Sequence, residues 1–255
     1  MAKNKESTGF ILTIAIVLSL VCATLVSLAA VGLKPIQDKN AALEKKRNIL
    51  GAAGIYRDGD DIEKVFADNI IAVAIDLKTG QPTDAIDPTT FNAVKAAKDP
   101  QTGTILKDDP AKIGGIAKYA VIYQLKTNDK VTRVILPIRG YGLWGTMFGF
   151  LAMNTDGKTI EGLTFYEQKE TPGLGAEIQN PAWQAKWVGK KPYGKGDTPD
   201  IQLVKNVSTK PDVAQQQVDS LAGATLTSRG VQKTINFWLS QQGYGPYLKT
   251  LTQAQ

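Results

Sequence analysis

Three hydroxyl side chains, those of Thr225, Thr227 and Ser228, lie within four residues of one another. Thr225 follows the small residues Gly223 and Ala224, which cannot shield its hydroxyl group. The apolar residues that come next have helical spacing, so the segment is predicted to be a tight turn followed by the start of a helix. The N-terminus of a helix offers unpaired N–H groups and a partial positive charge, which together favour a phosphate group.

These hydroxyl groups have two alternative roles. All three lie where an N-cap residue is expected, so they could simply cap the helix. One of them could instead hold a phosphorylated ligand at the helix N-terminus. The predicted helix continues through Val231, Ile235 and Leu239 and ends at Gly243, a suitable residue just past a helix end. Residue spacing alone leaves both roles open.

Composition excludes several kinds of chemistry. The 255 residues contain no histidine and a single cysteine, Cys22. The sequence therefore has no thiolate–imidazole dyad, no CxxC or haem-binding CxxCH motif, no zinc site and no set of cysteines for an iron–sulfur cluster. If the protein transfers electrons, it needs an organic cofactor or ligands shared with another chain. We predict no metal site and no catalytic residue on this chain.

The net charge of +6 comes from dispersed lysines. The densest group lies in a predicted loop rich in glycine and proline and consists of Lys186, Lys190, Lys191 and Lys195. No recognition motif accompanies this charge, so nucleic-acid binding is not expected.

Residues 10–33 carry no charge and are numerous enough to span a bilayer as a helix. A signal peptide is the competing interpretation, but its apolar region has only about 7–15 residues. A lipid-anchored cysteine is disfavoured because the bulky Val21 precedes Cys22, which is then a small apolar residue within the helix. We therefore predict an uncleaved anchor. Counts of Lys and Arg on its two sides do not settle its orientation.

The rest of the chain predicts one α+β domain with a largely antiparallel sheet flanked by helices. Segment 34–60 is predicted to be a helical stalk. Segment 81–112 is predicted to be a surface insertion with a short helix at 91–97. Apolar strands are predicted at 69–77, 117–125, 131–138, 159–166 and 201–207. Asp156-Gly157 predicts a hairpin before the fourth of these strands.

Two glycine-rich segments are further candidates for a binding site. Gly140–Gly145 matches GxGxxG, but the residues after it do not read as a helix, so a dinucleotide-binding fold is rejected. Its glycines and aromatic residues serve either strand packing or a wall for a planar ligand. In Glu170–Gly175, Pro-Gly predicts a turn where the backbone can approach another group closely.

The run Asp219-x-x-Ala222-Gly223-Ala224-Thr225 resembles the flavinylation motif Asp-x-x-(Ser/Thr)-Gly-Ala-Thr, in which FMN is esterified through its phosphate to the threonine. Ala222 departs from this motif. The order of features along the chain resembles that of the C subunit of the Na+-translocating NADH:quinone reductase. These features are the N-terminal anchor, GYGLWGTMFGFLA, ETPGLGAEI, DSLAGATLTS and a helix with Phe237-Trp238. The similarity covers essentially the whole chain. The G subunit of the Rnf electron-transport complex shares the motif but is usually shorter, and the 81–112 insert favours the reductase.

The resemblance implies that Thr225 carries a covalent FMN, which a separate flavin transferase attaches, while Thr227 and Ser228 keep the capping role. It also implies a one-electron relay in a six-subunit inner-membrane complex, with A, B, D, E and F as the other subunits, which oxidises NADH, reduces ubiquinone and pumps sodium. The expected organisation is a cytoplasmic N-terminus at 1–9, a transmembrane helix at 10–33, the stalk at 34–60 and a periplasmic FMN-binding domain at 61–255. A cofactor-free, membrane-anchored scaffolding module is the alternative from another class.

The flavin-binding residues that we expect include the motif positions Asp219, Gly223 and Ala224. The two glycine-rich segments are expected to surround the ring with glycine backbone and aromatic surface, through Tyr141, Leu143, Trp144, Glu170, Thr171, Gly173, Leu174 and Gly175. Lys205, in the predicted strand before the motif, is a candidate partner of the phosphate or the flavin.

Overall fold

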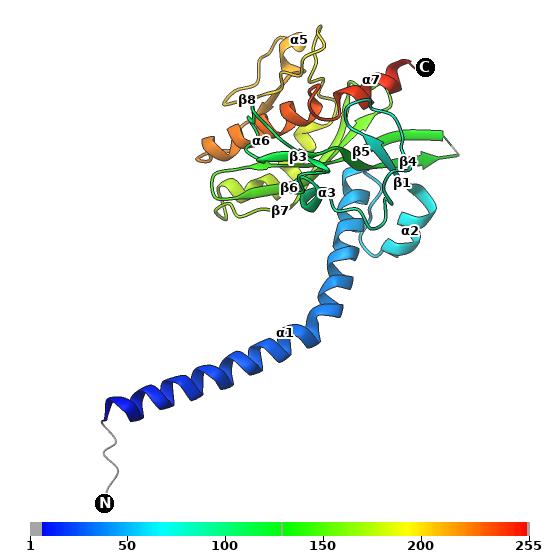
Figure 1. The fold of residues 1–255 in the computed structure, drawn as a ribbon. Coiled ribbons are helices and arrows are strands. Elements are labelled where there is room, and N and C mark those ends of the chain that lie inside the picture. The colour runs from blue at the N-terminus through cyan, green and yellow to red at the C-terminus, as the bar shows by residue number, and fades with distance from the viewer. Residues whose placement is uncertain (1–6, 129, 254–255) are drawn as a thin grey trace, which may run out of the picture. The chain divides into compact units, whose positions relative to one another are not determined.

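The structure, a computed structural model, describes residues 7–128 and 130–253. These residues form two compact units, one that ends at Glu44 and one that begins at Lys45 (Figure 1). The first unit is the greater part of helix α1 (Thr8–Ala52), which is long and apolar enough to cross a membrane.

Helix α1 continues without interruption through Pro35, where a separate stalk helix was expected. Proline removes one backbone donor from a helix interior. The helix nevertheless continues to Ala52, and its last turn is buried. Ile49 and Leu50 are buried in the second unit, so part of the predicted stalk belongs to the globular domain.

The second unit contains a five-stranded sheet in the order β1-β4-β5-β6-β7, with every neighbouring pair antiparallel. Helix α2 (Ile62–Asn69), capped by the Asp61 side chain, leads directly into the first strand. The strands are β1 (Ile70–Asp76), β4 (Tyr119–Thr127), β5 (Lys130–Tyr141), β6 (Thr146–Asn154) and β7 (Ile160–Glu167). The predicted α+β class and the antiparallel sheet are confirmed.

The segment after GxGxxG is strand β6, so the rejection of a dinucleotide-binding helix is correct. The predicted hairpin between β6 and β7 is also confirmed. Its turn is held by Asp156, whose Oδ1 accepts hydrogen bonds from the backbone N–H groups of Lys158 at 2.7 Å and Thr159 at 2.8 Å. Partial burial is the largest single influence and raises the pKa of the Asp156 carboxyl, but the hydrogen bonds from Thr159 and Lys158, together with the charge of Lys191, lower this pKa overall.

Smaller elements complete the domain. The 81–112 segment contains α3 (Ala93–Ala96) and β2 (Gly103–Ile105), which pairs with β3 (Gly115–Ala117). The predicted strand at 201–207 is shorter than expected: β8 (Gln202–Val204) pairs in parallel with β9 (Gln217–Asp219). The remaining elements are η1 (Gly175–Gln179), α4 (Pro181–Gln184), η2 (Ala185–Trp187), α5 (Pro211–Ala214), α6 (Thr225–Leu239) and α7 (Gly245–Gln253).

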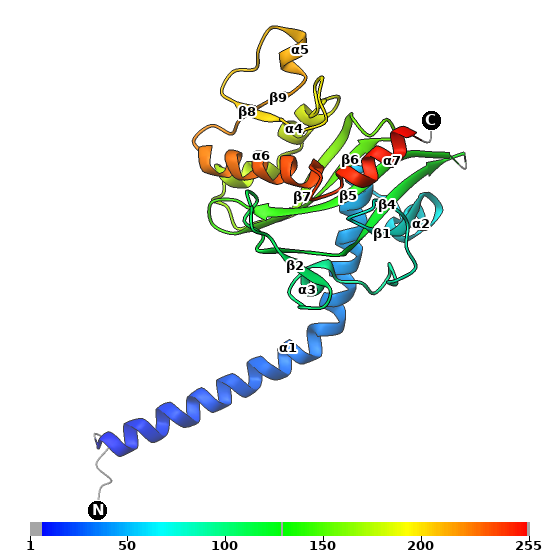
Figure 2. The same ribbon diagram turned by 45° about the horizontal axis from the view of Figure 1, so that its top comes forward.

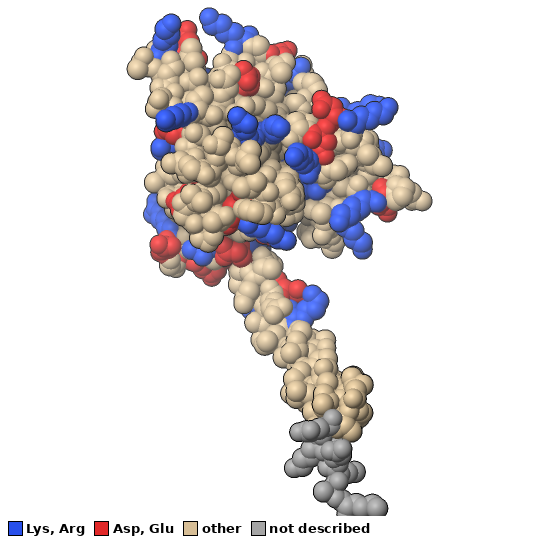
Figure 3. Space-filling view, turned by 90° about the vertical axis from the view of Figure 1, so that its left-hand side faces the viewer, with Lys and Arg blue, Asp and Glu red and all other residues tan. Residues whose placement is uncertain are grey.

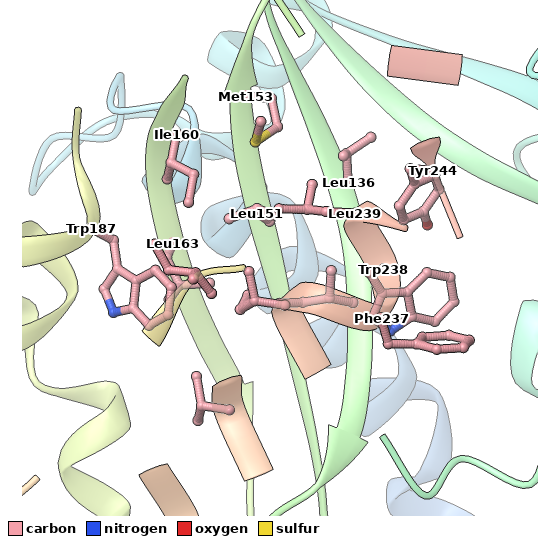
Figure 4. Close-up of a cluster of buried hydrophobic side chains, with 14 of the residues drawn as sticks. Leu136, Leu151, Met153, Ile160, Leu163, Trp187, Phe237, Trp238, Leu239 and Tyr244 are labelled. Atoms are coloured by element: carbon pink, nitrogen blue, oxygen red, sulfur yellow. The ribbon is translucent and has the colours of Figure 1, made fainter. Parts of the chain in front are cut away.

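Two hydrophobic cores lie on the two faces of the sheet, because successive side chains of a strand point to opposite faces. Helices α6 and α7 cover one face, where Leu136 and Leu151 pack with Trp238 and Leu239 (Figures 2 and 4). On the other face, the end of α1 and helix α2 pack against residues such as Phe150. Helix α6 is thereby fixed against the middle of the sheet.

Strands β4 and β5 separate along part of their length. They pair from Tyr123 and Ile135 toward their hairpin, but β4 residues before Tyr123 pair only with β1. Pro137, which has no N–H group to donate, lies in β5 where this separation begins. The carbonyl groups of Pro137 and Arg139 accept hydrogen bonds from Tyr244 Oη at 2.8 Å and Trp238 Nε1 at 2.7 Å. The two side chains therefore replace the missing strand partner.

The burial of α1's last turns predicts that Leu50→Ala destabilises the globular unit. Leu50 is fully buried, so the truncation should lower the free energy of unfolding by about 2–5 kcal/mol. Urea unfolding of the detergent-solubilised chain, followed by tryptophan fluorescence, measures this change. The exposed Val188→Ala serves as the control and should change stability by no more than about 0.5 kcal/mol. Equal stability of the two variants would mean that the helix end does not contribute to the domain.

Candidate functional site

Thr225 is the first residue of α6, and its side chain is exposed. The turn before it needs glycine at position 223, where φ is 72°, a conformation that other residues rarely adopt. Ala224 is the N-cap residue and supplies no side-chain hydrogen bond. Among the described residues, none accepts a hydrogen bond from the N–H groups of Thr225, Leu226 or Thr227. This helix N-terminus is thus open to an anion.

The predicted capping role of Thr227 and Ser228 is wrong. Both side chains are buried and face the interior of the domain rather than the end of the helix. Thr227 Oγ1 donates a hydrogen bond to Oε2 of Glu170, and Ser228 Oγ accepts one from the backbone N–H of Leu221 at 3.0 Å. The two hydroxyl groups attach the first turn of α6 to neighbouring segments.

Glu170 holds three segments together. Its side chain is only 5% exposed. Oε1 accepts hydrogen bonds from the backbone N–H groups of Leu143 at 3.0 Å and Trp144 at 2.9 Å, while Oε2 accepts from Thr227. The carboxylate therefore connects the β5–β6 hairpin loop, its own loop and helix α6. Both oxygens are used within the protein, which gives Glu170 a role in holding these loops.

The loop from Glu170 to Gly175 lies tightly against α6. A Cβ atom at Gly175 would be 2.6 Å from Oγ1 of Thr227 and 2.9 Å from Oε2 of Glu170, so there is no room for a side chain. A Cβ atom at Gly223 would be 3.0 Å from Cδ2 of Leu174, which places the tip of this loop beside the turn before Thr225. The structure thus brings the predicted Glu170–Gly175 loop next to the turn that precedes Thr225.

Large apolar side chains are exposed around this junction. Trp144 is 62% exposed and Leu226 is 54% exposed. We call the set the apolar rim, and it consists of Tyr141, Leu143, Trp144, Leu174 and Leu226. Seen from the side on which α6 begins, much of the globular unit's surface is uncharged, with Lys and Arg in scattered groups (Figure 3). Leu226 was not predicted, although its place next to Thr225 in the first helical turn is a signal that could have found it.

Among the described residues, none of the other predicted site residues forms a hydrogen bond or an ion pair with Thr225. The Asp219 carboxylate forms an ion pair with Lys186, with 2.8 Å between Oδ2 and Nζ, and its carbonyl accepts from Trp183 Nε1 at 2.8 Å. Lys205 is exposed just past β8. Thr171 and Gly173 lie in the exposed turn, where the Thr171 carbonyl accepts from the N–H groups of Leu174 and Ala176.

A comparison with protein-family models matches residues 142–240 to the FMN-binding domain. This range begins in the hairpin loop held by Glu170 and ends at the C-terminal end of α6. The chain is also 45% identical over 250 residues to the C subunit of the Na(+)-translocating NADH-quinone reductase of Vibrio anguillarum, covering 97% of this chain and 96% of that one. The corresponding protein of Pseudomonas aeruginosa is 42% identical over 99% of both chains. The chain belongs to this family of reductase C subunits.

Solved structures agree with this assignment. The crystal structure of Shewanella oneidensis NqrC matches with a TM-score of 0.77 and 32% identity, over 83% of this chain and 97% of that one. The structure of the C subunit from Parabacteroides distasonis matches with a TM-score of 0.67 and 26% identity, over 86% and 97%. The predicted resemblance is confirmed, and the chain is a subunit of an oxidoreductase complex with an FMN-binding domain.

The contacts of Glu170 predict that Glu170→Ala loosens the hairpin loop. The truncation leaves two N–H groups without their acceptor, at a cost of about 1–3 kcal/mol for each group that stays buried. We expect faster amide hydrogen exchange at Leu143 and Trp144 and a lower free energy of unfolding. The exposed Glu167→Ala is a matched control and should change neither quantity. Unchanged exchange in Glu170→Ala would contradict the role of this carboxylate.

Proposed function

We propose that Thr225 carries FMN through a phosphoester bond between its hydroxyl group and the flavin phosphate. The observation that carries this proposal is an exposed hydroxyl on the first residue of α6, beside three N–H groups that no described residue binds. An esterified phosphate keeps a negative charge, which the positive end of the helix dipole stabilises. Thr227 and Ser228 are unsuited to this attachment because their hydroxyl groups are buried and already bonded.

We further propose that the apolar rim contacts the flavin ring. A planar aromatic ring loses unfavourable contact with water when it lies against side chains such as Tyr141, Trp144 and Leu174. The backbone of Gly173 in the loop tip adds surface that a flat ligand can approach closely. Glu170 acts indirectly in this proposal, because it holds the hairpin loop and α6 at a fixed distance from each other.

The other motif positions have supporting roles. Gly223 and Ala224 shape the turn that presents Thr225 and leave its hydroxyl accessible to a flavin transferase. Asp219 ties the end of β9 to Lys186. Lys205 remains a candidate partner for the phosphate or the flavin, since no ion pair involving it is recorded among the described residues.

Bound FMN would supply one-electron transfer, and this chain would bind and orient it as a relay. The oxidation of NADH and the reduction of ubiquinone would take place on the other subunits of the sodium-pumping complex, A, B, D, E and F. This chain would contribute no catalytic residue of its own. The proposal rests on the family assignment and on the site around Thr225.

We propose an inner-membrane location with the N-terminus at 1–9 in the cytoplasm, residues 10–33 in the bilayer and the FMN-binding domain in the periplasm. The long apolar helix α1 supports the anchor. The family resemblance supports the orientation, because the distribution of Lys and Arg leaves it open. We propose the 34–60 segment as the connection between the anchor and the domain, and the compact unit that begins at Lys45 includes its second half.

Covalent attachment predicts a fluorescent band after denaturing gel electrophoresis under ultraviolet light. The chain, produced together with its flavin transferase, should show this band, and Thr225→Leu should abolish it because no hydroxyl remains at this position. Thr198→Leu, which removes another exposed hydroxyl, is the matched control and should keep the fluorescence. Absence of fluorescence in the unsubstituted protein would refute the covalent flavin and would favour a scaffolding role. Persistence of the band in Thr225→Leu would place the attachment elsewhere.

A further inference from the structure

The separation of β4 from β5 opens a cavity of about 380 Å³ away from Thr225. Its volume lies in the range typical of ligand-binding pockets, about 300–1,000 Å³. Its walls are mainly aromatic and aliphatic, and include Phe91, Tyr119, Val121, Pro137, Phe148 and Tyr166. None of these residues takes part in the proposed flavin site.

Two aromatic side chains hold one side of this cavity in place. The rings of Trp238 and Tyr244 (Figure 4) are stacked, with centroids 5.1 Å apart. Both residues line the cavity. Their hydrogen bonds to the carbonyl groups of β5 fix them where β4 would otherwise pair. Burial raises the pKa of Tyr244, so its hydroxyl group stays protonated and keeps donating to Pro137. This side of the cavity is therefore fixed by hydrogen bonds to the sheet.

The guanidinium of Arg139, which lines this apolar space, forms no close ion pair with a described carboxylate, although Asp109 attracts it from a longer distance. Nη2 of Arg139 donates to the Gly115 carbonyl at 2.8 Å. The oxygens of nearby Asp109 instead accept from the N–H groups of Ile113 at 3.0 Å and Gly114 at 2.6 Å. Burial lowers the pKa of Arg139, and the nearby Asp109 carboxylate partly opposes this shift. An arginine in a protein stays charged at neutral pH.

Two other charged residues line the cavity. Nζ of Lys45 lies 5.7 Å from the centroid of the Tyr123 ring. Glu167 is exposed at the end of β7, so water can solvate its carboxylate. Arg139 is the more buried of the cations, and a partly desolvated charge gains most from a counter-ion.

We propose that this cavity binds a long-chain fatty acid, whose carboxylate pairs with Arg139 and whose alkyl chain lies between β4 and β5. The planar guanidinium matches a carboxylate in a two-hydrogen-bond geometry, which gives the head group its specificity. The aromatic and aliphatic walls remove the chain from water. This site is independent of the flavin at Thr225, and the two can be tested separately.

Photolabelling tests the proposal on the full chain in phosphatidylcholine nanodiscs. A palmitate with a photoreactive group in its chain should label peptides that contain residues 91–94, 119–123 and 137–139, and excess unlabelled palmitate should suppress the labelling. A fatty alcohol with the same chain and photoreactive group should label these peptides about tenfold less, because it lacks the charge that pairs with Arg139. Equal labelling by the alcohol, or by a photoreactive phosphatidylcholine, would overturn the proposal, as would palmitate labelling confined to residues 10–33.

Variants test the contribution of the head-group contact and that of the cavity separately. Arg139→Met should reduce palmitate labelling about tenfold, Arg139→Lys should restore part of it, and Arg57→Met, which removes an exposed arginine, should have no effect. Val94→Trp fills the cavity from α3 without changing Arg139 and should also reduce labelling. If Arg139→Met fails to fold, as judged by tryptophan fluorescence, Val94→Trp decides. Full labelling of Val94→Trp would overturn the proposal. Loss of labelling in the assembled complex would also overturn it, because a neighbouring protein would then occupy the cavity.

Discussion

The junction around Thr225 depends on one buried carboxylate. A charged group of this kind is costly to bury unless it accepts several hydrogen bonds, and Glu170 obtains them from two backbone N–H groups and one hydroxyl. These donors belong to the β5–β6 hairpin loop and to helix α6, whereas Glu170 belongs to a third segment. The requirement to satisfy the carboxylate therefore fixes the relative positions of all three. The absence of space for a side chain at Gly175 shows how closely they approach.

The first turn of α6 divides its residues between two tasks. Thr227 and Ser228 face the domain and attach the helix to neighbouring segments, while Thr225 and Leu226 face outward. This division follows from helix geometry, because adjacent residues differ by about 100° around the axis. A reactive hydroxyl has to be accessible, whereas the helix that carries it has to be rigid. One helical turn meets both needs by burying one side and exposing the other.

The sequence was sufficient for the features that depend on local pattern. Apolar runs predicted the strands, Asp156-Gly157 predicted the β6–β7 hairpin, and helical spacing predicted α6. It failed where the outcome depends on distant partners. The capping role of Thr227 was wrong because its actual partner, Glu170, is 57 residues away in the sequence. The separation of β4 from β5 depends in the same way on partners distant in the sequence, because Tyr244 and Trp238 bind the free carbonyl groups of β5.

The motif around Thr225 combines several physical requirements at different positions. Position 223 needs a backbone conformation that glycine adopts readily, and Ala224 is a buried N-cap residue with little space around it. Asp219 connects two surface segments through its ion pair with Lys186. Ala222 is exposed, so no buried polar group depends on a hydroxyl at this position. The serine or threonine that the motif usually has at position 222 is therefore not needed for this turn to form. Of the motif residues, only Thr225 combines exposure, a hydroxyl group and a position at the positive end of a helix, which is why attachment of a phosphate is expected there.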